Sequence, residues 1–382
     1  MITGGGKDSR IVKFDTLYRK TGLEAALPDH LGSIRTVSQV LTDQLVVLVF
    51  SLLIPLSLTS LLQGKGSQLL VGTTRNSILT GNFDLNFQEI MVGHVSDVPA
   101  LAASPSQPQF ISAGHDRQLH LWDILTRQVV WSNDVGEQAQ SACFSPDGEV
   151  IVVGTVTGKW VVLSAATREV YGVHQDGEQP VHTAKFSPDG AALALGSRDN
   201  AIYIYSVREG YRKFSRAGRC LGHSTAVTQL DWTTDSQHIQ SNSGAELLYW
   251  NATTCRSVRD IDTIREFEWA SGDCVVSWSS LGCWGEGPDT PDPTAVSRCK
   301  VLYCTVYHTY CTVMQGRDLV AAGDTAGRVK LYTGPVCQVR ALHHSYPGHS
   351  SAVTAVRWSA DTNTLLSVGG RDTAVLQWSL VQ

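Results

Sequence analysis

Residues 114–123 read GHDRQLHLWD, and this stretch is the clearest evidence in the sequence for the fold class. A Gly-His-Asp turn leads into a short segment in which apolar and polar residues alternate, as in a half-buried strand. His94 lies 22 positions before Asp116, and Trp122 lies six positions after it. A turn and a strand held at fixed distances from an earlier histidine indicate one unit of a repeat array.

Further copies of the pattern recur at roughly forty-residue spacing along the chain. One copy opens at His349 and continues through Asp372 to Trp378, again six positions after the aspartate. Another opens at His223 and ends at Trp250. Repeats of this length, built from short strands and tight turns, are typical of the four-stranded blades of a WD-repeat β-propeller.

The turn that occupies the same place in every copy can be followed through the chain. The interval after Asp8 is 68 residues and the interval after Ala245 is 79, so each holds an extra segment. The sequence predicts an all-β WD-repeat β-propeller of about seven blades, in a single domain over residues 1–382, from seven to eight repeat units of which the first is incomplete. The turn positions are Asp8, Asn76, Asp116, Gly158, Asp199, Ala245, Asp324 and Asp372.

Polar residues at equivalent blade positions predict a repeated hydrogen-bond network. The turn aspartate can accept a hydrogen bond from the entrance histidine, which can link to a Ser or Thr and to the indole N–H. A catalytic histidine would not recur in every blade, so we interpret these residues as structural. The set comprises His94, Asp116, Trp122, His223, Trp250, His349, Asp372 and Trp378.

The first extra segment is the apolar stretch 40–63. Residues 45–62 carry no charge and have the length of a marginal membrane span. However, the flanking segments 34–38 and 69–72 have the pattern of adjacent strands of one blade, and Pro55 interrupts the stretch. A membrane cannot separate two paired strands, so we interpret residues 40–63 as an insertion rather than a membrane span, and we predict no membrane partner.

The second extra segment is the Cys-rich stretch 299–315. Cys299, Cys304, His308 and Cys311 are close enough in sequence to form a weak candidate zinc site, and the alternative is an irregular loop insertion. The nine cysteines are an odd number and the N-terminus is Gly-rich and polar rather than a secretory signal. These features predict a reducing, cytosolic compartment.

Composition and motifs argue against several classes of function. The formal net charge of −5 provides no basic field for nucleic acid. The Gly-rich run before Lys7 is followed by Asp8, where a phosphate-binding loop needs Ser or Thr. We therefore predict no enzyme activity, no cofactor, no nucleic-acid partner and no small-molecule substrate.

Several longer strings go beyond a generic WD repeat and resemble the echinoderm microtubule-associated protein-like family. The resemblance covers nearly the whole chain except the two extra segments. The strings are LLVGTTRNSIL at 69–79, SNSG at 241–244 with LYW at 248–250, EFEWA at 266–270, WGEG at 284–287, GHSSAVT at 348–354 and GGRDTAVLQW at 369–378.

The resemblance places this chain at the second of the family's two tandem propellers. It implies binding to microtubules or tubulin, and a location in the cytoplasm, on the microtubule cytoskeleton and at the mitotic spindle. One departure concerns His223: the family's usual Asp after Ser-Asn-Ser-Gly is replaced by Ala245, so His223 is expected to lose its acceptor.

Loops on a rigid propeller are the predicted binding surface. Basic residues beside the blade turns could steer an acidic partner such as tubulin, despite the negative net charge. The alternative function is a general WD-repeat scaffold or adaptor that binds other proteins through its rims. The basic candidates are Arg117, Lys159, Arg198, Arg328 and Arg371.

Overall fold

The structure is a computed structural model. For the strands before residue 73 and for residues 300–314 it describes the backbone alone. The residues described are 2–4, 10–14, 20–26, 34–39, 69–73, 76–81, 87–284, 291–300, 303–307, 310–314, 318–338 and 341–380.

The chain forms two compact units. The first comprises Met1–Val95 with Asp372–Ala374, and the second comprises Ser96–Arg371 with Val375–Gln382. The first unit contains two antiparallel sheets. One has the order β1 (Ile2–Gly4), β2 (Arg10–Phe14), β3 (Lys20–Ala26); the other has the order β4 (Ile34–Gln39), β5 (Leu69–Thr73), β6 (Ser77–Gly81), β7 (Phe87–Val92).

Strands β4 and β5 flank the apolar stretch and pair with each other. Their register runs from Ile34 opposite Thr73 to Gln39 opposite Leu69. The prediction that these flanks are adjacent strands of one sheet is therefore confirmed. Residues 40–63 themselves lie outside the described residues, and no helix in the described ranges is long and apolar enough to cross a membrane.

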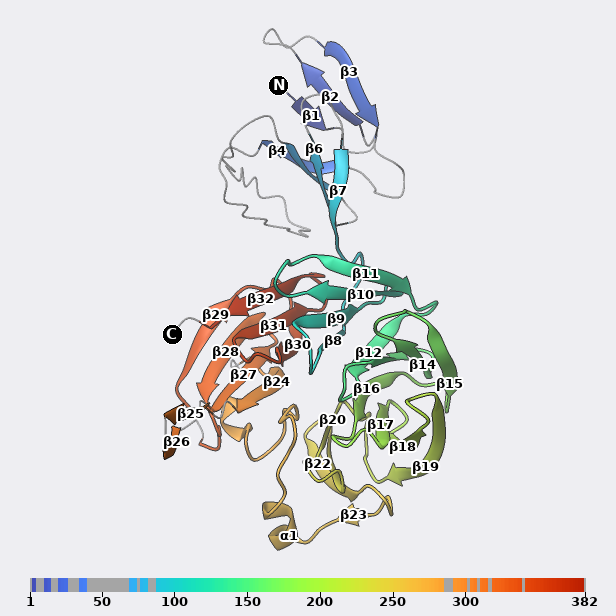
Figure 1. Ribbon diagram of the computed structural model, residues 1–382, viewed down its shortest axis with the longest axis vertical. Helices are drawn as coiled ribbons and strands as arrows, with labels where there is room; N and C mark the ends of the chain where they lie inside the picture. Colours follow the sequence, from blue (N-terminus) through green and yellow to red (C-terminus); the bar gives the residue numbers. More distant parts are fainter. Residues whose placement is uncertain are drawn as a thin grey trace. The chain divides into compact units, whose positions relative to one another are not determined.

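The second unit contains six antiparallel sheets arranged around a centre (Figure 1). Five have four strands and the last has three. In spatial order they are β8 (Ala100–Ala103), β9 (Gln109–Ala113), β10 (Gln118–Asp123), β11 (Val129–Asp134); β12 (Ala139–Phe144), β13 (Val150–Thr155), β14 (Lys159–Ser164), β15 (Val170–Gln175); β16 (Val181–Phe186), β17 (Ala192–Ser197), β18 (Ala201–Arg208), β19 (Lys213–Leu221); β20 (Gln229–Trp232), β21 (His238–Ser243), β22 (Glu246–Asn251), β23 (Ser257–Val258); β24 (Pro293–Lys300), β27 (Asp318–Asp324), β28 (Arg328–Thr333), β29 (His343–Pro347); and β30 (Val353–Trp358), β31 (Thr364–Gly369), β32 (Val375–Ser379).

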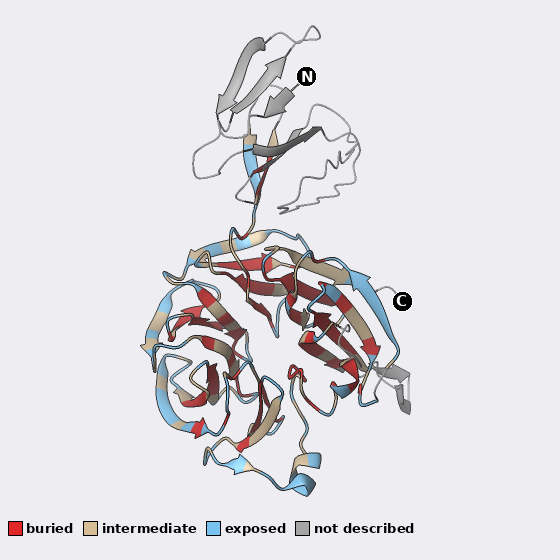
Figure 2. Ribbon diagram, turned by 180° about the vertical axis from the view of Figure 1, so that it is seen from behind, coloured by how far each residue is buried: buried red, intermediate tan, exposed pale blue. Residues whose placement is uncertain are grey.

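Burial within each sheet explains the hydrophobic pattern. The second and third strands are covered on both faces by neighbouring sheets, so β13 (VIVVGT) is buried at every position. The outer strands alternate between exposed and half-buried residues, as in β11 (VVWSND). Figure 2 shows this gradient from the buried inner strands to the exposed outer ones.

Apolar side chains from adjacent sheets fill the spaces between them. Trp160 and Val162 of one sheet pack with Leu193, Leu195 and Tyr203 of the next. The first and last sheets meet in the same way, because Leu101 and Trp122 share a cluster with Leu366 and Val368. Thr354 Oγ also donates a hydrogen bond to the carbonyl of Val98 over 2.9 Å. These contacts close the second unit into a ring.

One junction in this ring differs from the others. Between β23 and β24 the chain forms the one-turn helix α1 (Ile261–Arg265) and the 3₁₀ turn η2 (Leu281–Cys283). Residues 269–284, here termed the wedge segment, lie between the sheets β20–β23 and β24–β29. Val275 and Cys283 of this segment pack against Val296, Val320 and Tyr332 of the following sheet.

The prediction of about seven blades is wrong, because six sheets surround the centre in the described part of the second unit. Of the eight counted turn positions, Asp8 lies between β1 and β2 and Asn76 between β5 and β6, so these turns join strands of the first unit. The long interval between Ala245 and Asp324 adds no further sheet to the ring, since its residues form the wedge segment and the separate hairpin β25 (Tyr303–Tyr307) and β26 (Tyr310–Met314).

Candidate functional site

A serine hydroxyl joins the entrance histidine to the strand tryptophan in two sheets. In the sheet β20–β23, His223 Nε2 lies 2.6 Å from Ser241 Oγ, and Trp250 Nε1 donates to the same oxygen over 2.8 Å. In the last sheet, His349 Nε2 and Trp378 Nε1 each lie 2.8 Å from Ser367 Oγ. One hydroxyl therefore satisfies two buried nitrogens in each copy.

The acceptor expected to be lost from His223 is present, which corrects that expectation. Glu246 Oε2 lies 3.2 Å from His223 Nδ1 and also accepts a hydrogen bond from Ser224 N over 3.1 Å. Glu246 is the first residue of β22, and its longer side chain reaches the histidine that a missing turn aspartate would have contacted. Hydrogen bonds from Ser224 lower the pKa of the Glu246 carboxyl.

The remaining residues of the predicted network occupy buried or turn positions. His94 is buried, and Trp122 Nε1 donates to Ser112 Oγ over 2.8 Å. The two turn aspartates accept backbone hydrogen bonds: Asp116 Oδ1 from Gln118 N and Asp372 Oδ1 from Ala374 N, each over 3.1 Å. These contacts hold turns and strands in place.

The five basic candidates lie at equivalent turns of the second unit. Each stands in or beside the turn between the second and third strands of its sheet, so all five turns lie at the same end of the ring. Arg117, Arg198, Arg328 and Arg371 are exposed. Sheets of equivalent topology thus gather basic side chains that are far apart in sequence onto one rim.

Lys159 differs from the four arginines because it is already paired. Its Nζ lies 2.5 Å from Glu137 Oε1, and the lysine side chain is 40 % exposed. This hydrogen bond is the main cause of a lowered pKa for the Glu137 carboxyl. Lys159 is therefore a weaker candidate for contacting a partner than the exposed arginines.

The inner strands enclose a central channel of about 940 Å³. Its walls come from β8, β12, β16, β20, β24 and β30, each the first strand of its sheet. Small or polar side chains line much of it, including Ser141, Thr183 and Gln229. A charged cluster lies at the end of the channel where these strands turn into the second strands.

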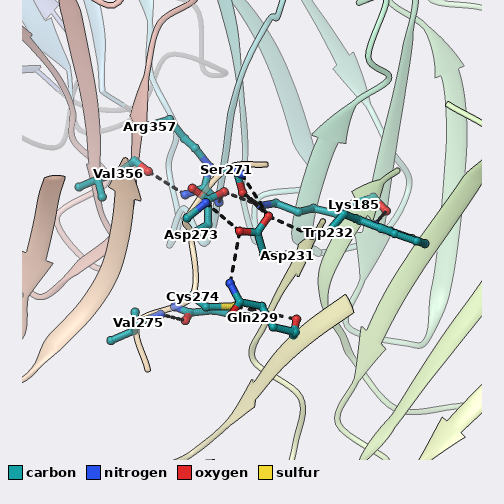
Figure 3. A network of polar contacts seen from close by, with 12 residues as sticks. Lys185, Gln229, Asp231, Trp232, Ser271, Asp273, Cys274, Val275, Val356 and Arg357 are labelled. Atoms are coloured by element: carbon teal, nitrogen blue, oxygen red, sulfur yellow. Dashed lines mark hydrogen bonds and ion pairs between the residues drawn. The ribbon is translucent and has the colours of Figure 1, made fainter. Parts of the chain in front are cut away.

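This charged cluster links β16, β20, β30 and the wedge segment (Figure 3). Lys185 Nζ lies 2.7 Å from Asp273 Oδ2 and 3.5 Å from Asp231 Oδ1. Arg357 Nη2 lies 3.6 Å from Asp273 Oδ2. Asp231 also accepts hydrogen bonds from Ser271 Oγ over 2.6 Å and from Gly272 N over 2.7 Å.

Opposite charges determine the protonation of this cluster. Burial by itself raises the pKa of Asp273, but Arg357 and Lys185 reverse that effect and hold it below its usual value. Burial lowers the pKa of Lys185, and the carboxylates of Asp273 and Asp231 more than offset it, so the pKa is raised. Asp273 and Lys185 therefore favour their charged forms in each other's presence, which suits anchoring the wedge segment.

The sequence patterns did not identify this cluster, although they contain a signal for it. Lys185, Asp231 and Arg357 each immediately precede the aromatic residue that ends the first strand of a sheet. All three residues line the channel, close to the turn between the first and second strands of their sheets. Asp273 belongs to no repeat, so no spacing rule would have placed it there.

The weak zinc candidate falls mainly on undescribed residues. Cys299 lies in β24 and is buried, and burial raises the pKa of its thiol. His308 and the side chains of Cys304 and Cys311 lie outside the described residues. Across the ranges that are described, no cluster of three His, Cys, Asp or Glu side chains is arranged to hold a metal ion.

Comparison with protein families gives a match over most of the chain. Residues 98–380 match the family model described as "Echinoderm microtubule-associated protein second beta-propeller". The matched region begins just before β8 and ends after β32, so it coincides with the sheets of the second unit.

Curated relatives align over the whole chain. The rat protein "Echinoderm microtubule-associated protein-like 2" is 41% identical over 379 residues, which is 99% of this chain and 52% of the relative. The mouse "Echinoderm microtubule-associated protein-like 1" is 38% identical over 100% of this chain and 42% of its own length. The "77 kDa echinoderm microtubule-associated protein" of Lytechinus variegatus is 36% identical, over 100% of this chain and 52% of its own length. These matches confirm the resemblance drawn from the sequence strings, and the chain spans about half the length of the curated relatives it matches.

Proposed function

The chain belongs to the echinoderm microtubule-associated protein family, and we propose that it supplies a non-catalytic propeller that binds microtubules or soluble tubulin. The observation that carries this proposal is the full-length alignment with relatives that are named as microtubule-associated proteins. The proposed location is the cytoplasm, on the microtubule cytoskeleton and at the mitotic spindle. Residues 1–382 would then represent the second propeller of a tandem pair.

The rim that carries Arg117, Arg198, Arg328 and Arg371 is the proposed contact surface. Tubulin has a strongly acidic surface, and cations gathered on one face attract such a partner even when the net charge is negative. The four guanidinium groups are exposed and come from four different sheets. A rigid ring that presents them together favours contact with a broad acidic surface rather than with a small ligand.

Charge reversal on this rim tests the proposal. The double substitution Arg198→Glu with Arg371→Glu should weaken the affinity of the full chain for unpolymerised tubulin at low salt by about tenfold, because each exposed ion pair contributes modestly. The loss of affinity is followed by co-elution with tubulin on gel filtration. The matched control is Arg127→Glu with Arg168→Glu, two exposed arginines in turns between third and fourth strands, at the opposite end of the ring. Unchanged tubulin binding by the rim variant, or equal loss in the control, would overturn the rim assignment. No co-elution by the unaltered chain would favour a general scaffold for other proteins.

A further inference from the structure

The outer strand β19 differs from the other outer strands of the second unit. It spans nine residues, whereas β11 and β15 span six, β29 five and β23 two. It is the last strand of its sheet, paired with β18 on one side only within the described chain. Its outward backbone N–H and C=O groups are therefore available to a further strand.

This strand is also the cationic one. Residues 208–219 contain five basic residues, all exposed, and a single acidic residue, Glu209. The strands β11, β15, β23 and β29 contain no Lys or Arg. The basic residues are Arg208, Arg212, Lys213, Arg216 and Arg219.

Aromatic rings hold three of these arginines in place. Arg212 lies 4.7 Å from the centre of the Tyr171 ring, and Arg216 and Arg219 lie 4.9 and 5.2 Å from the centre of the Tyr203 ring. Stacking of this kind restricts the side chain and leaves most guanidinium N–H groups free to donate. Cations ordered in advance lose less entropy when a carboxylate binds.

Nearby carboxylates only partly neutralise these arginines. Arg216 Nη1 lies 3.7 Å from Asp176 and Arg219 Nη2 lies 3.3 Å from Asp199. Both carboxylates also accept hydrogen bonds from tyrosine hydroxyls, Asp176 from Tyr205 and Asp199 from Tyr203. A third carboxylate, Glu209, lies 3.1 Å from Lys213 Nζ. The five basic residues therefore face three paired carboxylates, and the edge retains an excess of positive charge.

We propose that the outer edge of β19 is a docking strand for an acidic protein segment in extended conformation, which pairs with the edge backbone and places carboxylates against the flanking arginines. Backbone pairing would supply affinity and the cations would select acidic sequences. This surface lies on the outer wall of the ring. Its Arg219 end adjoins the turn that carries Arg198, because Arg219 pairs with Asp199, whereas Arg208 and Lys213 face each other at the opposite end of β18 and β19. The inference goes beyond the proposed function, because it does not require that the partner be tubulin.

Two N-methylated peptides test the strand pairing. The probe is a blocked, fluorescently labelled nine-residue peptide of alternating Glu and Thr, titrated with the full chain at low salt. In an added strand only alternate residues direct their N–H groups at the neighbouring edge. One peptide is methylated at the odd-numbered amide nitrogens and the other at the even-numbered ones. The peptide whose methyl groups face the edge should bind at least about tenfold more weakly, and the other should bind like the unmethylated parent. Equal binding by both methylated peptides would overturn strand addition.

Charge reversal locates the binding site. The triple variant Arg208→Glu, Arg212→Glu and Lys213→Glu should weaken binding of the unmethylated peptide by at least about tenfold. The matched control, Arg127→Glu with Arg168→Glu and Arg265→Glu, makes the same charge change at exposed positions outside residues 208–219. Circular dichroism verifies that both variants fold.

Two further outcomes decide the proposal. Equal weakening in the triple variant and its control would mean that net charge alone drives binding, and the proposal would fail. A rim variant that leaves the Arg198 turn intact, Arg117→Glu with Arg371→Glu, should bind the peptide normally. If the rim variant loses the peptide while the β19 variant retains it, the acidic segment binds the rim and the edge assignment is wrong.

Discussion

Two junctions between neighbouring sheets of the second unit are built in different ways. The sheets β12–β15 and β16–β19 meet directly through apolar side chains, among them Trp160, Leu193 and Tyr203. The sheets β20–β23 and β24–β29 are separated by the wedge segment. Its backbone is held by polar side chains, since Val275 N donates to Gln229 Oε1 over 2.7 Å and Val276 N to Asn242 Oδ1 over 3.0 Å.

The contrast between these two junctions shows how the ring accommodates an irregular segment. A repeated apolar junction needs only side chains of suitable volume, and the same pattern can serve in every copy. The wedge segment exposes backbone polar groups to a buried space, so each group needs a specific partner. Asn242 provides two of them, accepting from Val276 N and donating to its carbonyl over 2.8 Å. The irregular junction therefore depends on a few particular polar residues.

The largest effect is expected from breaking the apolar junction. Trp160 is fully buried in the cluster between the two sheets. Trp160→Ala should lower the free energy of unfolding by about 4 kcal/mol, through lost apolar burial and the cavity left behind. Urea denaturation followed by circular dichroism measures this loss. The matched control is Trp278→Ala, which removes a side chain that is 70% exposed and should cost less than about 0.5 kcal/mol. Equal costs would contradict the assigned packing.

The charged cluster at the wedge junction should give the next largest effect. Asp273→Asn removes the carboxylate closest to Lys185 and leaves the buried ammonium group less well paired, at a cost of about 3 kcal/mol. The double variant Lys185→Met with Asp273→Asn should recover at least half of that loss, because no buried lysine remains. Urea midpoints of the two variants give the comparison. If the double variant is less stable than Asp273→Asn, the pair does not act as a compensated unit.

A smaller effect is expected from the shared serine, which occurs beside both kinds of junction. Ser241 accepts from Trp250 in the sheet next to the wedge segment, and Ser367 accepts from Trp378 in the last sheet. Ser241→Ala and Ser367→Ala should each cost about 2 kcal/mol, since two buried nitrogens lose their common partner. Thermal denaturation should show similar shifts for the two variants. A shift confined to one variant would mean that the copies are not equivalent.

The contrast also explains how much the sequence could predict. The strands followed from alternating apolar residues and from turns at a fixed position, and the pairing of β4 with β5 followed from the flanks of residues 40–63. The number of sheets in the ring could not be predicted in this way, because the spacing of the turns gives the number of repeats but not the compact unit to which each repeat belongs. The replacement of the turn aspartate by Glu246 required geometry, since the longer side chain compensates for a shorter turn. The role of Asp273 could not be predicted, because this residue lies outside the repeats and its contacts recur at no fixed spacing.

The smallest expected effect is the pH dependence of stability that the charged cluster causes. Such a dependence should be found at the wedge junction and not at the apolar junction. The pKa of Asp273 is lowered in the folded protein, so its contribution to stability is fully present above 3.8, the usual pKa of an aspartate, and is lost as the pH falls through the folded pKa. The pKa of Lys185 is raised, so its contribution is present below 10.5 and is lost as the pH rises through the folded pKa. The stability difference between the unaltered chain and the variant Lys185→Met with Asp273→Asn should therefore stay constant from about pH 5 to about pH 9 and change in the variant's favour below about pH 4. Urea denaturation across this range measures the difference. Leu193→Ala provides the control, because the removed side chain is buried in the apolar junction and carries no polar group, so its deficit should not follow the same curve. If the stability difference between the unaltered chain and the double variant instead changes near neutral pH, groups other than Asp273 and Lys185 cause the pH dependence.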